Sequence, residues 1–261
     1  MTTTTIDPTT RRVPPLGGFN GTIVGIELRR MLRNRRTVIF AMIFPAAMFL
    51  VFGSGGDSGQ SVGEGNVSAY VMVSMAMYGA ALTAAAAGTQ VALERAMGWS
   101  RQLRLTPLNP TVYIVVKAII ALVLGALAIA TVNLVGVLQG KPEMPADVWV
   151  KCALLALACT SVFAALGLFV GYLLPGENAM QVLGPGLALL AFLGGLFIPL
   201  DQYAAWVRDI AYWTPMYGVA EITRAPLTHE LPWYAVVNAI GWLAIFVAGA
   251  AWRMSRDTAR V

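Results

Sequence analysis

Apolar residues gather in six long runs along this chain, and short polar segments separate them. The runs cover roughly residues 38–53, 68–93, 111–139, 148–174, 179–199 and 233–252. A helix of about 20 apolar residues crosses the roughly 30 Å hydrocarbon core of a bilayer. The pattern therefore predicts six transmembrane helices. The first is short and carries Pro45 in its interior, where a kink is expected.

The stretch from Phe19 to Arg36 has a different, amphipathic pattern. One face carries Val24, Leu28, Met31 and Leu32, and the other carries Arg29, Arg30 and Arg33. Ile26 falls on the polar face, so the separation is imperfect. This pattern is typical of a helix that lies in the lipid headgroup layer. A simple positively charged anchor before the first span is an open alternative.

Basic residues lie unevenly among the polar segments. Residues 94–110 carry three arginines, whereas residues 53–67 carry Asp57 and Glu64 and no base. Thirteen of the 18 Lys and Arg residues lie in the two terminal regions and in residues 94–110. Because basic loops stay on the cytoplasmic side, we expect a multi-pass protein of the plasma membrane with both termini in the cytoplasm.

Composition supports a membrane location and excludes some other classes. The chain has 261 residues, of which 57% are hydrophobic and only 12% charged, against about 25% charged in soluble domains. The arginines follow membrane topology and form no aromatic-interleaved patch, so we expect membrane lipid and no nucleic acid as a partner. Residues 1–18 are rich in Thr and Pro and are predicted to be a disordered cytoplasmic tail. Residues 19–261 are predicted to form a single transmembrane domain.

Residues 94–110 are the most informative polar segment. Pro107 and Pro110 stop helices that enter from either side. Between them and the preceding span, residues 96–105 favour a short helix with Trp99 and Leu103 on one face. Such a helix either docks on a soluble partner or lies flat on lipid headgroups.

The spacing in this segment carries a resemblance to a known family. The residues concerned are Glu94, Arg95, Gly98, Leu103, Thr106, Pro107 and Leu108, followed by Lys117 at the start of the next span. This order resembles the loop between the second and third spans of type-2 ABC transporter permeases. In that family the segment is a cytoplasmic coupling helix, seated in a cleft of a separate ATP-hydrolysing subunit.

The resemblance extends to residues 200–232, which are too long for a tight turn and crowded with aromatic residues. Aromatic residues at this density favour the outer membrane interface or a re-entrant hairpin. The matching positions are Gly195, Pro199, Trp206, Ile210, Pro215, Tyr217 and Arg224. The resemblance thus implies an all-α polytopic membrane protein. Its six transmembrane helices are accompanied by an N-terminal interfacial elbow helix, the coupling helix and a re-entrant external helical hairpin.

The resemblance also implies roles for the coupling residues. Glu94 and Arg95 are expected to fix the loop by ion pairing near the end of the span, and Gly98 to allow close approach. Trp99 and Leu103 are expected to supply apolar contact with the ATPase. The set expected to couple the chain to its ATPase comprises Glu94, Arg95, Gly98, Trp99, Leu103, Thr106 and Pro107.

We predict the membrane subunit of an ATP-driven exporter, paired with a second copy (homodimer) or a homologous permease (heterodimer). The substrate path is expected between the two subunits, lined by Met75, Tyr78, Leu82, Leu189, Phe192 and Phe197. Apolar, Met-bearing and aromatic linings suit hydrophobic drugs, antibiotics or lipids, which predicts a role in efflux and antibiotic resistance. Plain helix packing explains the same residues, and export of a polysaccharide or other glycan is an open alternative.

Several kinds of chemistry are missing from the sequence. No GxxxxGK[ST] motif occurs, so ATP and Mg²⁺ are expected on a partner pair of ATP-binding subunits. This chain itself is expected to be a transport subunit that is not an enzyme and binds no cofactor or metal. Residues 59–63 match GxSxG by letter, but they lie in a Gly/Ser loop far from His229, the sole histidine. A non-transport assembly factor or a membrane-embedded enzyme is the competing class.

Four smaller features leave alternatives that a structure can decide. Gly167 and Gly171 form a GxxxG pair that suits either a contact within the chain or a dimer seam. Asn133, inside a span, suits an interhelical hydrogen bond or a functional site. Cys152 and Cys159 are expected to be small packing residues, and residues 66–68 form a glycosylation sequon.

Overall fold

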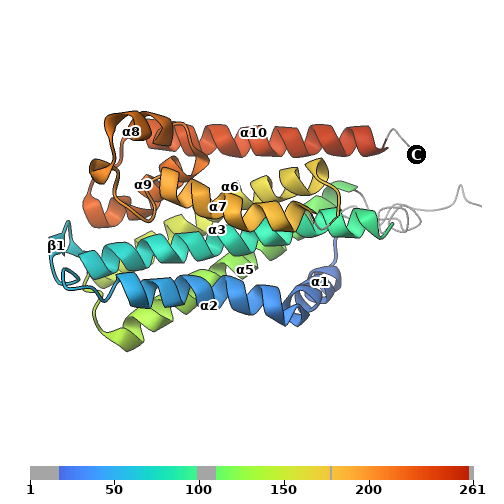
Figure 1. Ribbon diagram of the computed structural model, residues 1–261. Helices are drawn as coiled ribbons and strands as arrows, with labels where there is room; N and C mark the ends of the chain where they lie inside the picture. The colour runs from blue at the N-terminus through green and yellow to red at the C-terminus, as the bar shows by residue number, and fades with distance from the viewer. Residues whose placement is uncertain (1–17, 99–109, 177, 259–261) are drawn as a thin grey trace, which may run out of the picture.

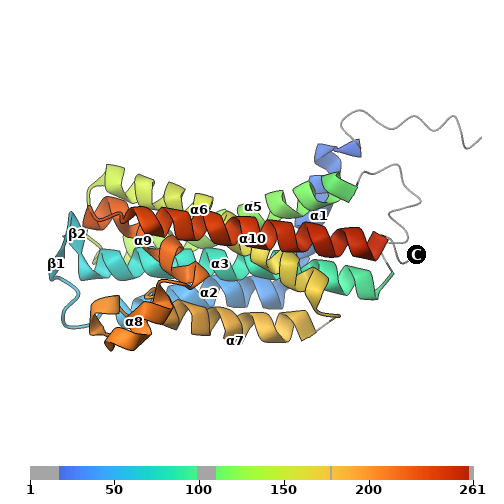
Figure 2. The ribbon, with the colours of Figure 1, turned by 90° about the horizontal axis from the view of Figure 1, so that it is seen from above.

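A computed structural model shows a bundle of α-helices whose long members run roughly parallel (Figures 1 and 2). It describes residues 18–98, 110–176 and 178–258. Within these residues, four helices are long and apolar enough to cross a membrane. They are α3 (Val67–Ala96), α5 (Pro110–Gln139), α6 (Ala146–Leu173) and α10 (Trp233–Thr258). This is the architecture of a polytopic all-α membrane protein, and four of the predicted spans are long helices as expected.

The other two predicted spans coincide with shorter helices. Helix α2 (Arg35–Phe52) has 18 residues and α7 (Asn178–Leu193) has 16. A 16-residue helix reaches about 24 Å, which is less than the roughly 30 Å of a bilayer core. The fifth span was predicted to run to Pro199, but its helix ends earlier because Gly195 adopts a left-handed φ of 74°. The number of six membrane crossings therefore stays a prediction.

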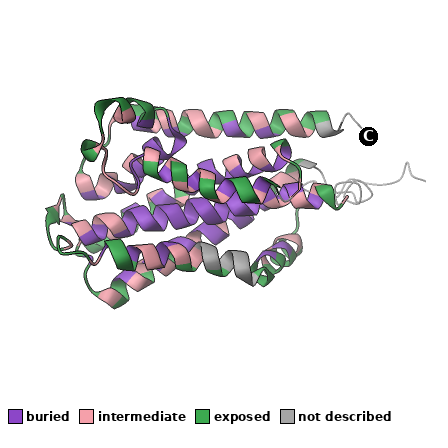
Figure 3. Ribbon diagram, in the orientation of Figure 1, coloured by how far each residue is buried: buried purple, intermediate pink, exposed green. Residues whose placement is uncertain are grey.

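Helix α3 is the centre of the bundle (Figure 3). In its most apolar 18-residue stretch, 94% is buried inside the chain. Its small residues let α6 approach closely: a Cβ added at Gly167 would lie 2.2 Å from the backbone oxygen of Ala85, and one at Gly88 would lie 2.5 Å from the backbone nitrogen of Leu168. Gly171 packs on the same seam, 3.1 Å from the oxygen of Gly88 by the same measure. The GxxxG pair therefore forms a contact within the chain.

Helix α1 (Gly21–Arg33) precedes the bundle and lies at an angle to it, at the end where α10 terminates (Figure 1). We call this end, rich in arginine, the basic end. The side chain of Asn20 caps α1 by accepting a hydrogen bond from the backbone of Thr22 at 2.9 Å. Met31 is buried and Ile26 exposed, as predicted from the pattern, whereas Leu32, predicted on the apolar face, is exposed.

The opposite end of the bundle holds short elements, and we call it the aromatic end. The two-stranded hairpin β1 (Ser61–Val62) and β2 (Gly65–Asn66) joins α2 to α3. Between α7 and α10 lie η3 (Leu200–Gln202), α8 (Ala205–Ala211) and α9 (Pro215–Thr228). The residues predicted to form a helical hairpin contain the two short helices α8 and α9, while the external side and the re-entry into the membrane stay predictions. The exposed tryptophans of this end are Trp206, Trp213 and Trp233.

Asn66 ties the hairpin to the loop between α5 and α6. Its Oδ1 accepts hydrogen bonds from the backbone nitrogens of Ala69 at 2.9 Å and Glu143 at 3.1 Å. Its Nδ2 donates to the backbone oxygen of Lys141 at 2.8 Å. The amide nitrogen of the sequon is thus buried and engaged, so attachment of a glycan there requires this contact to break.

Two other questions left by the sequence are decided by side-chain contacts. Trp149 of α6 donates its indole hydrogen to Oδ1 of Asn133 in α5, which confirms the interhelical hydrogen bond. Cys152 and Cys159 are buried free thiols, in agreement with a packing role.

Candidate functional site

A cluster of four ionisable side chains from three helices lies at the basic end. Glu27 and Arg30 come from α1, Glu94 from the last turns of α3, and Lys117 from the first turns of α5. The Lys117 ammonium lies 2.5 Å from Oε1 of Glu94 and 3.0 Å from Oε2 of Glu27. Arg30 pairs with Glu94 as well and lies 3.5 Å from Glu27. We call this set the ion-pair cluster.

The ion-pair cluster is buried at its centre. The Glu94 side chain is 2% exposed and that of Lys117 is 3% exposed. Tyr113 donates its hydroxyl hydrogen to Glu94 and turns its ring face toward Lys117, with the ammonium 5.2 Å from the ring centroid. Two acids and two bases balance the charge, as buried ionisable groups require in a membrane protein. The cluster therefore fixes the end of α3 to both α1 and α5.

Arg95, the next residue, points toward α6. Its Nη1 donates to the backbone oxygens of Gly171 at 3.2 Å and Tyr172 at 3.1 Å. Its guanidinium also stands 5.4 Å from the centroid of the Tyr172 ring. Successive helical residues are about 100° apart around the axis, so Glu94 and Arg95 can reach different neighbours. The last turn of α3 is thereby attached to three helices.

Gly98 ends the described part of this segment. It adopts a φ of 74° and donates its backbone hydrogen to the oxygen of Arg95 at 3.0 Å. A glycine in this left-handed conformation terminates a helix at little cost. Among the described residues, no atom lies within 4 Å of a Cβ added at Gly98, and the positive φ by itself favours a glycine there. The other predicted coupling residues lie outside the described residues: Trp99, Leu103, Thr106 and Pro107.

The six residues predicted to line a substrate path separate into two groups. Met75, Tyr78 and Leu82 of α3 are buried in the core of the single chain. Leu189 and Phe192 of α7 are 60% and 48% exposed, respectively. The α3 residues are thus covered by their own chain in this conformation, and the α7 residues remain on its outside.

Phe197 connects the two groups through ring contacts. Its ring centroid lies 4.8 Å from that of Tyr78 and 4.9 Å from that of Phe192, both in edge-on geometry. An aromatic row thus leads from the exposed face of α7 toward α3. Whether substrate follows this row stays a prediction.

Sequence reasoning missed three members of the ion-pair cluster as site residues, and also Tyr113 beside it. Lys117 was noticed only as part of a spacing pattern, Arg30 only as part of the polar face of its helix, and Glu27 and Tyr113 were not singled out. A signal was present, because a lysine inside an apolar span needs a carboxylate partner. Glu27, the sole acid of the predicted amphipathic helix, was the obvious candidate for that carboxylate.

The described residues contain no group of three or more His, Cys, Asp or Glu side chains that suits a metal ion. His229 lies on the exposed surface, with Nε2 2.9 Å from Oε1 of Glu64. This contact agrees with the ordinary polar role expected for the histidine.

The long apolar helices, with charged groups paired where they are buried, define the class of a polytopic helical membrane protein. The sequence profile of the family described as "ABC-2 type transporter" matches residues 21–227. The chain belongs to this family, and it is a type-2 ABC transporter permease. It is 25% identical over 232 residues to the "Putative transport permease YvfS" of Bacillus subtilis (strain 168), covering 85% of this chain and 91% of that protein. Membership of the family implies association with an ATP-binding subunit.

Proposed function

We propose that this chain is the transmembrane subunit of an ATP-driven exporter, and that residues 94–110 dock on a separate ATP-binding subunit. The observation that carries the proposal is the ion-pair cluster, which fixes α3 at the point where the basic segment begins. A segment that transmits force needs such a rigid attachment. Helix α3 has 30 residues and therefore a length of about 45 Å, enough to carry a movement across the membrane.

In this proposal the basic end lies in the cytoplasm, and two permease copies, or this chain and a homologue, stand side by side. ATP and Mg²⁺ bind to the partner ATPase pair. Closure of that pair moves the two docked segments together. Because Glu94 and Arg95 attach the last turn of α3 to α1, α5 and α6, these helices move with the segment as one body.

The substrate class proposed here is hydrophobic compounds such as drugs, antibiotics or lipids. The exposed side chains of α7 support it, because Val182, Leu189 and Phe192 give this helix an apolar outer face. A path bordered by this face in each of two copies suits apolar or amphipathic molecules. Export of an amphipathic fluorescent dye from proteoliposomes, compared with a fluorescent oligosaccharide, distinguishes this class from the glycan alternative.

The coupling assignment is tested by the double variant Trp99→Ala with Leu103→Asp. We expect the wild-type chain in liposomes to recruit an ATP-binding subunit encoded beside its gene and to support ATP hydrolysis at the membrane. The double variant should release that subunit, because it removes the apolar contact and places a charge in its position. Co-sedimentation with liposomes and the rate of phosphate release measure the two effects.

The matched control carries the same two kinds of substitution at the aromatic end, Trp233→Ala with Leu231→Asp. Both side chains are exposed there, so the fold should tolerate the change. This control should recruit the ATPase as the wild type does. Equal recruitment by the coupling variant, or indifference of the ATPase to the wild-type chain, contradicts the proposal and favours an assembly factor or a membrane enzyme.

A further inference from the structure

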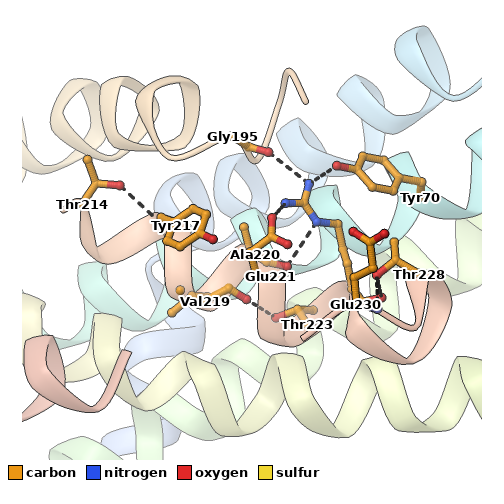
Figure 4. A network of polar contacts seen from close by, with 12 residues as sticks. Tyr70, Gly195, Thr214, Tyr217, Val219, Ala220, Glu221, Thr223, Thr228 and Glu230 are labelled. Carbon is orange, nitrogen blue, oxygen red and sulfur yellow. Dashed lines mark hydrogen bonds and ion pairs between the residues drawn. The ribbon is translucent and has the colours of Figure 1, made fainter. Parts of the chain in front are cut away.

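Arg224 in α9 is a buried charged residue at the aromatic end, and it belongs to neither the ion-pair cluster nor the predicted path. The four hydrogen-bond partners of its guanidinium, Tyr70, Gly195, Ala220 and Glu221, are labelled in Figure 4. Nη1 donates to the backbone oxygen of Gly195 at 3.0 Å and to the hydroxyl of Tyr70. Nη2 donates to Oε1 of Glu221 at 2.8 Å, and Nε donates to the backbone oxygen of Ala220 at 3.1 Å.

These partners come from three separate parts of the chain. Tyr70 belongs to α3, Gly195 to the turn that follows α7, and Glu221 to α9 itself. The planar guanidinium also stands 4.6 Å from the centroid of the Tyr70 ring. Such a fork can serve several acceptors in fixed directions at once, which a lysine ammonium cannot do. One side chain thus joins the central helix, the end of α7 and the hairpin.

The turn held by Arg224 is tightly enclosed. A Cβ added at Gly194 would lie 2.5 Å from Cβ of Met216, and one at Gly195 would lie 2.6 Å from Cγ of Leu200. Two rings of the aromatic row belong to this region: Phe192 lies just before the turn, and Phe197 is its last residue. The position of the turn therefore sets the position of both rings relative to α3.

We propose that Arg224 is a positioning residue that holds the turn of residues 194–197 closed against α3, and that release of the Gly195 oxygen opens the outer end of the substrate path. This inference rests on the proposed transport function, because the path exists only in a transporter. Opening moves Phe192 and Phe197 away from Tyr78 as the end of α7 leaves α3.

The partners of Arg224 explain why a charged residue suits a contact that must open. A buried arginine that loses its partners is strongly unfavourable. Here Glu221 and Tyr70 remain bonded to the guanidinium when the turn leaves. The Glu221 side chain is 24% exposed, so the ion pair reaches water at its edge. The contact with Gly195 can therefore break without leaving a buried charge unpaired. A packed apolar side chain in the place of Arg224 would leave a cavity when the turn moved away.

The test is the reaction of Phe197→Cys with a polar maleimide in the full chain, reconstituted in lipid nanodiscs and read at each cysteine by mass spectrometry. Arg224→Lys keeps the positive charge and loses the fork. We expect it to raise the labelling rate at position 197 about tenfold, in line with the loss of one hydrogen bond to a charged group. The matched control is Glu221→Gln, which changes another partner of the same guanidinium and leaves the Gly195 contact in place. Labelling at position 197 should stay as slow in this variant as in Phe197→Cys alone.

Cys152, a buried thiol of α6, is the internal reporter of general loosening. It should stay unlabelled in every variant. Labelling of Cys152 in parallel with position 197 would show that Arg224 only stabilises the bundle, and unchanged labelling at position 197 would show that it does not hold the turn. Either result overturns the inference.

A second measurement avoids the cysteine substitution, since Phe197→Cys removes a ring contact. Amide hydrogen exchange of residues 194–203 in otherwise unsubstituted chains should be about tenfold faster in Arg224→Lys than in the wild type. Exchange that stays unchanged overturns the inference. Recruitment of the ATPase by Arg224→Lys is measured alongside and should equal that of the wild type. If the wild-type chain fails to recruit the ATPase, the transport proposal is refuted. The role of Arg224 at the turn is not refuted by that result, because the labelling and exchange measurements do not involve the ATPase.

Discussion

Replacing Lys117 by methionine is expected to be the most damaging single substitution in the ion-pair cluster. Methionine keeps the length and apolar stem of lysine and removes its charge. Glu27 and Glu94 then face each other with only Arg30 to neutralise them. Leaving a buried charge without its partner destabilises a protein by about 3–5 kcal/mol. We expect a large drop in the melting temperature of the detergent-purified chain and in the yield of folded protein.

The chain offers a matched control in the pair of Asp147 and Lys151. Their charged atoms are 2.8 Å apart, close to the spacing in the cluster, but the side chains are 65% and 61% exposed. Lys151→Met should therefore leave the melting temperature close to that of the wild type, because an ion pair in water contributes little to stability.

A second variant separates the loss of the pair from the loss of lysine itself. Combining Glu94→Gln with Lys117→Met removes both charges and should recover part of the stability lost in Lys117→Met alone. A single Lys117→Met variant that melts with the wild type would contradict the buried cluster altogether.

Most of the fold could be predicted from the sequence because membrane helices follow a simple rule. Every backbone polar group in a bilayer must be paired, so a long apolar run becomes a helix. The runs at residues 68–93, 111–139, 148–174 and 233–252 each gave a helix within a few residues of the expected ends, except that α10 continues to Thr258. The same rule failed at residues 179–199. There the run is apolar apart from Gln181, but the helix ends after Leu193, just before Gly195 with its positive φ.

The candidate site could be predicted only in part, since its contacts join residues far apart in the sequence. Local spacing drew attention to Glu94 and Arg95 but could not supply their partners. Glu27 reaches Lys117 because α1 folds back against the start of α5, and no periodicity in the sequence encodes that approach. Gly98 shows a different limit. Its positive φ, which the sequence pattern did not predict, is a local reason for a glycine, and the close approach to the ATPase stays a prediction.

The seam between α3 and α6 shows the same limit for packing. The pair of Gly167 and Gly171 has the spacing of a close helix contact, and spacing alone cannot say which helix lies opposite. The structure places Ala85 and Gly88 of α3 there. The contact is therefore part of the fold of one chain, and mutations in it should act on stability before they act on assembly.

Gly167→Ala is expected to destabilise the chain although alanine is the better helix former. The added Cβ would lie 2.2 Å from the backbone oxygen of Ala85 and 2.7 Å from its Cα, and backbone atoms cannot rotate away. The two helices must separate, and overpacking of this kind typically costs about 1–3 kcal/mol. Gly167→Leu should prevent folding, because the whole side chain meets α3.

The control for Gly167→Ala is Gly241→Ala in α10, where no atom of the part of the chain that the structure describes lies within 4 Å of the added Cβ. Helix propensity alone then acts, and it favours alanine by up to about 1 kcal/mol. Thermal unfolding in detergent should show a lower midpoint for Gly167→Ala and an unchanged or slightly higher one for Gly241→Ala. If Gly167→Ala instead keeps wild-type stability and loses only self-association, the glycine pair faces a second copy and the seam described here is wrong.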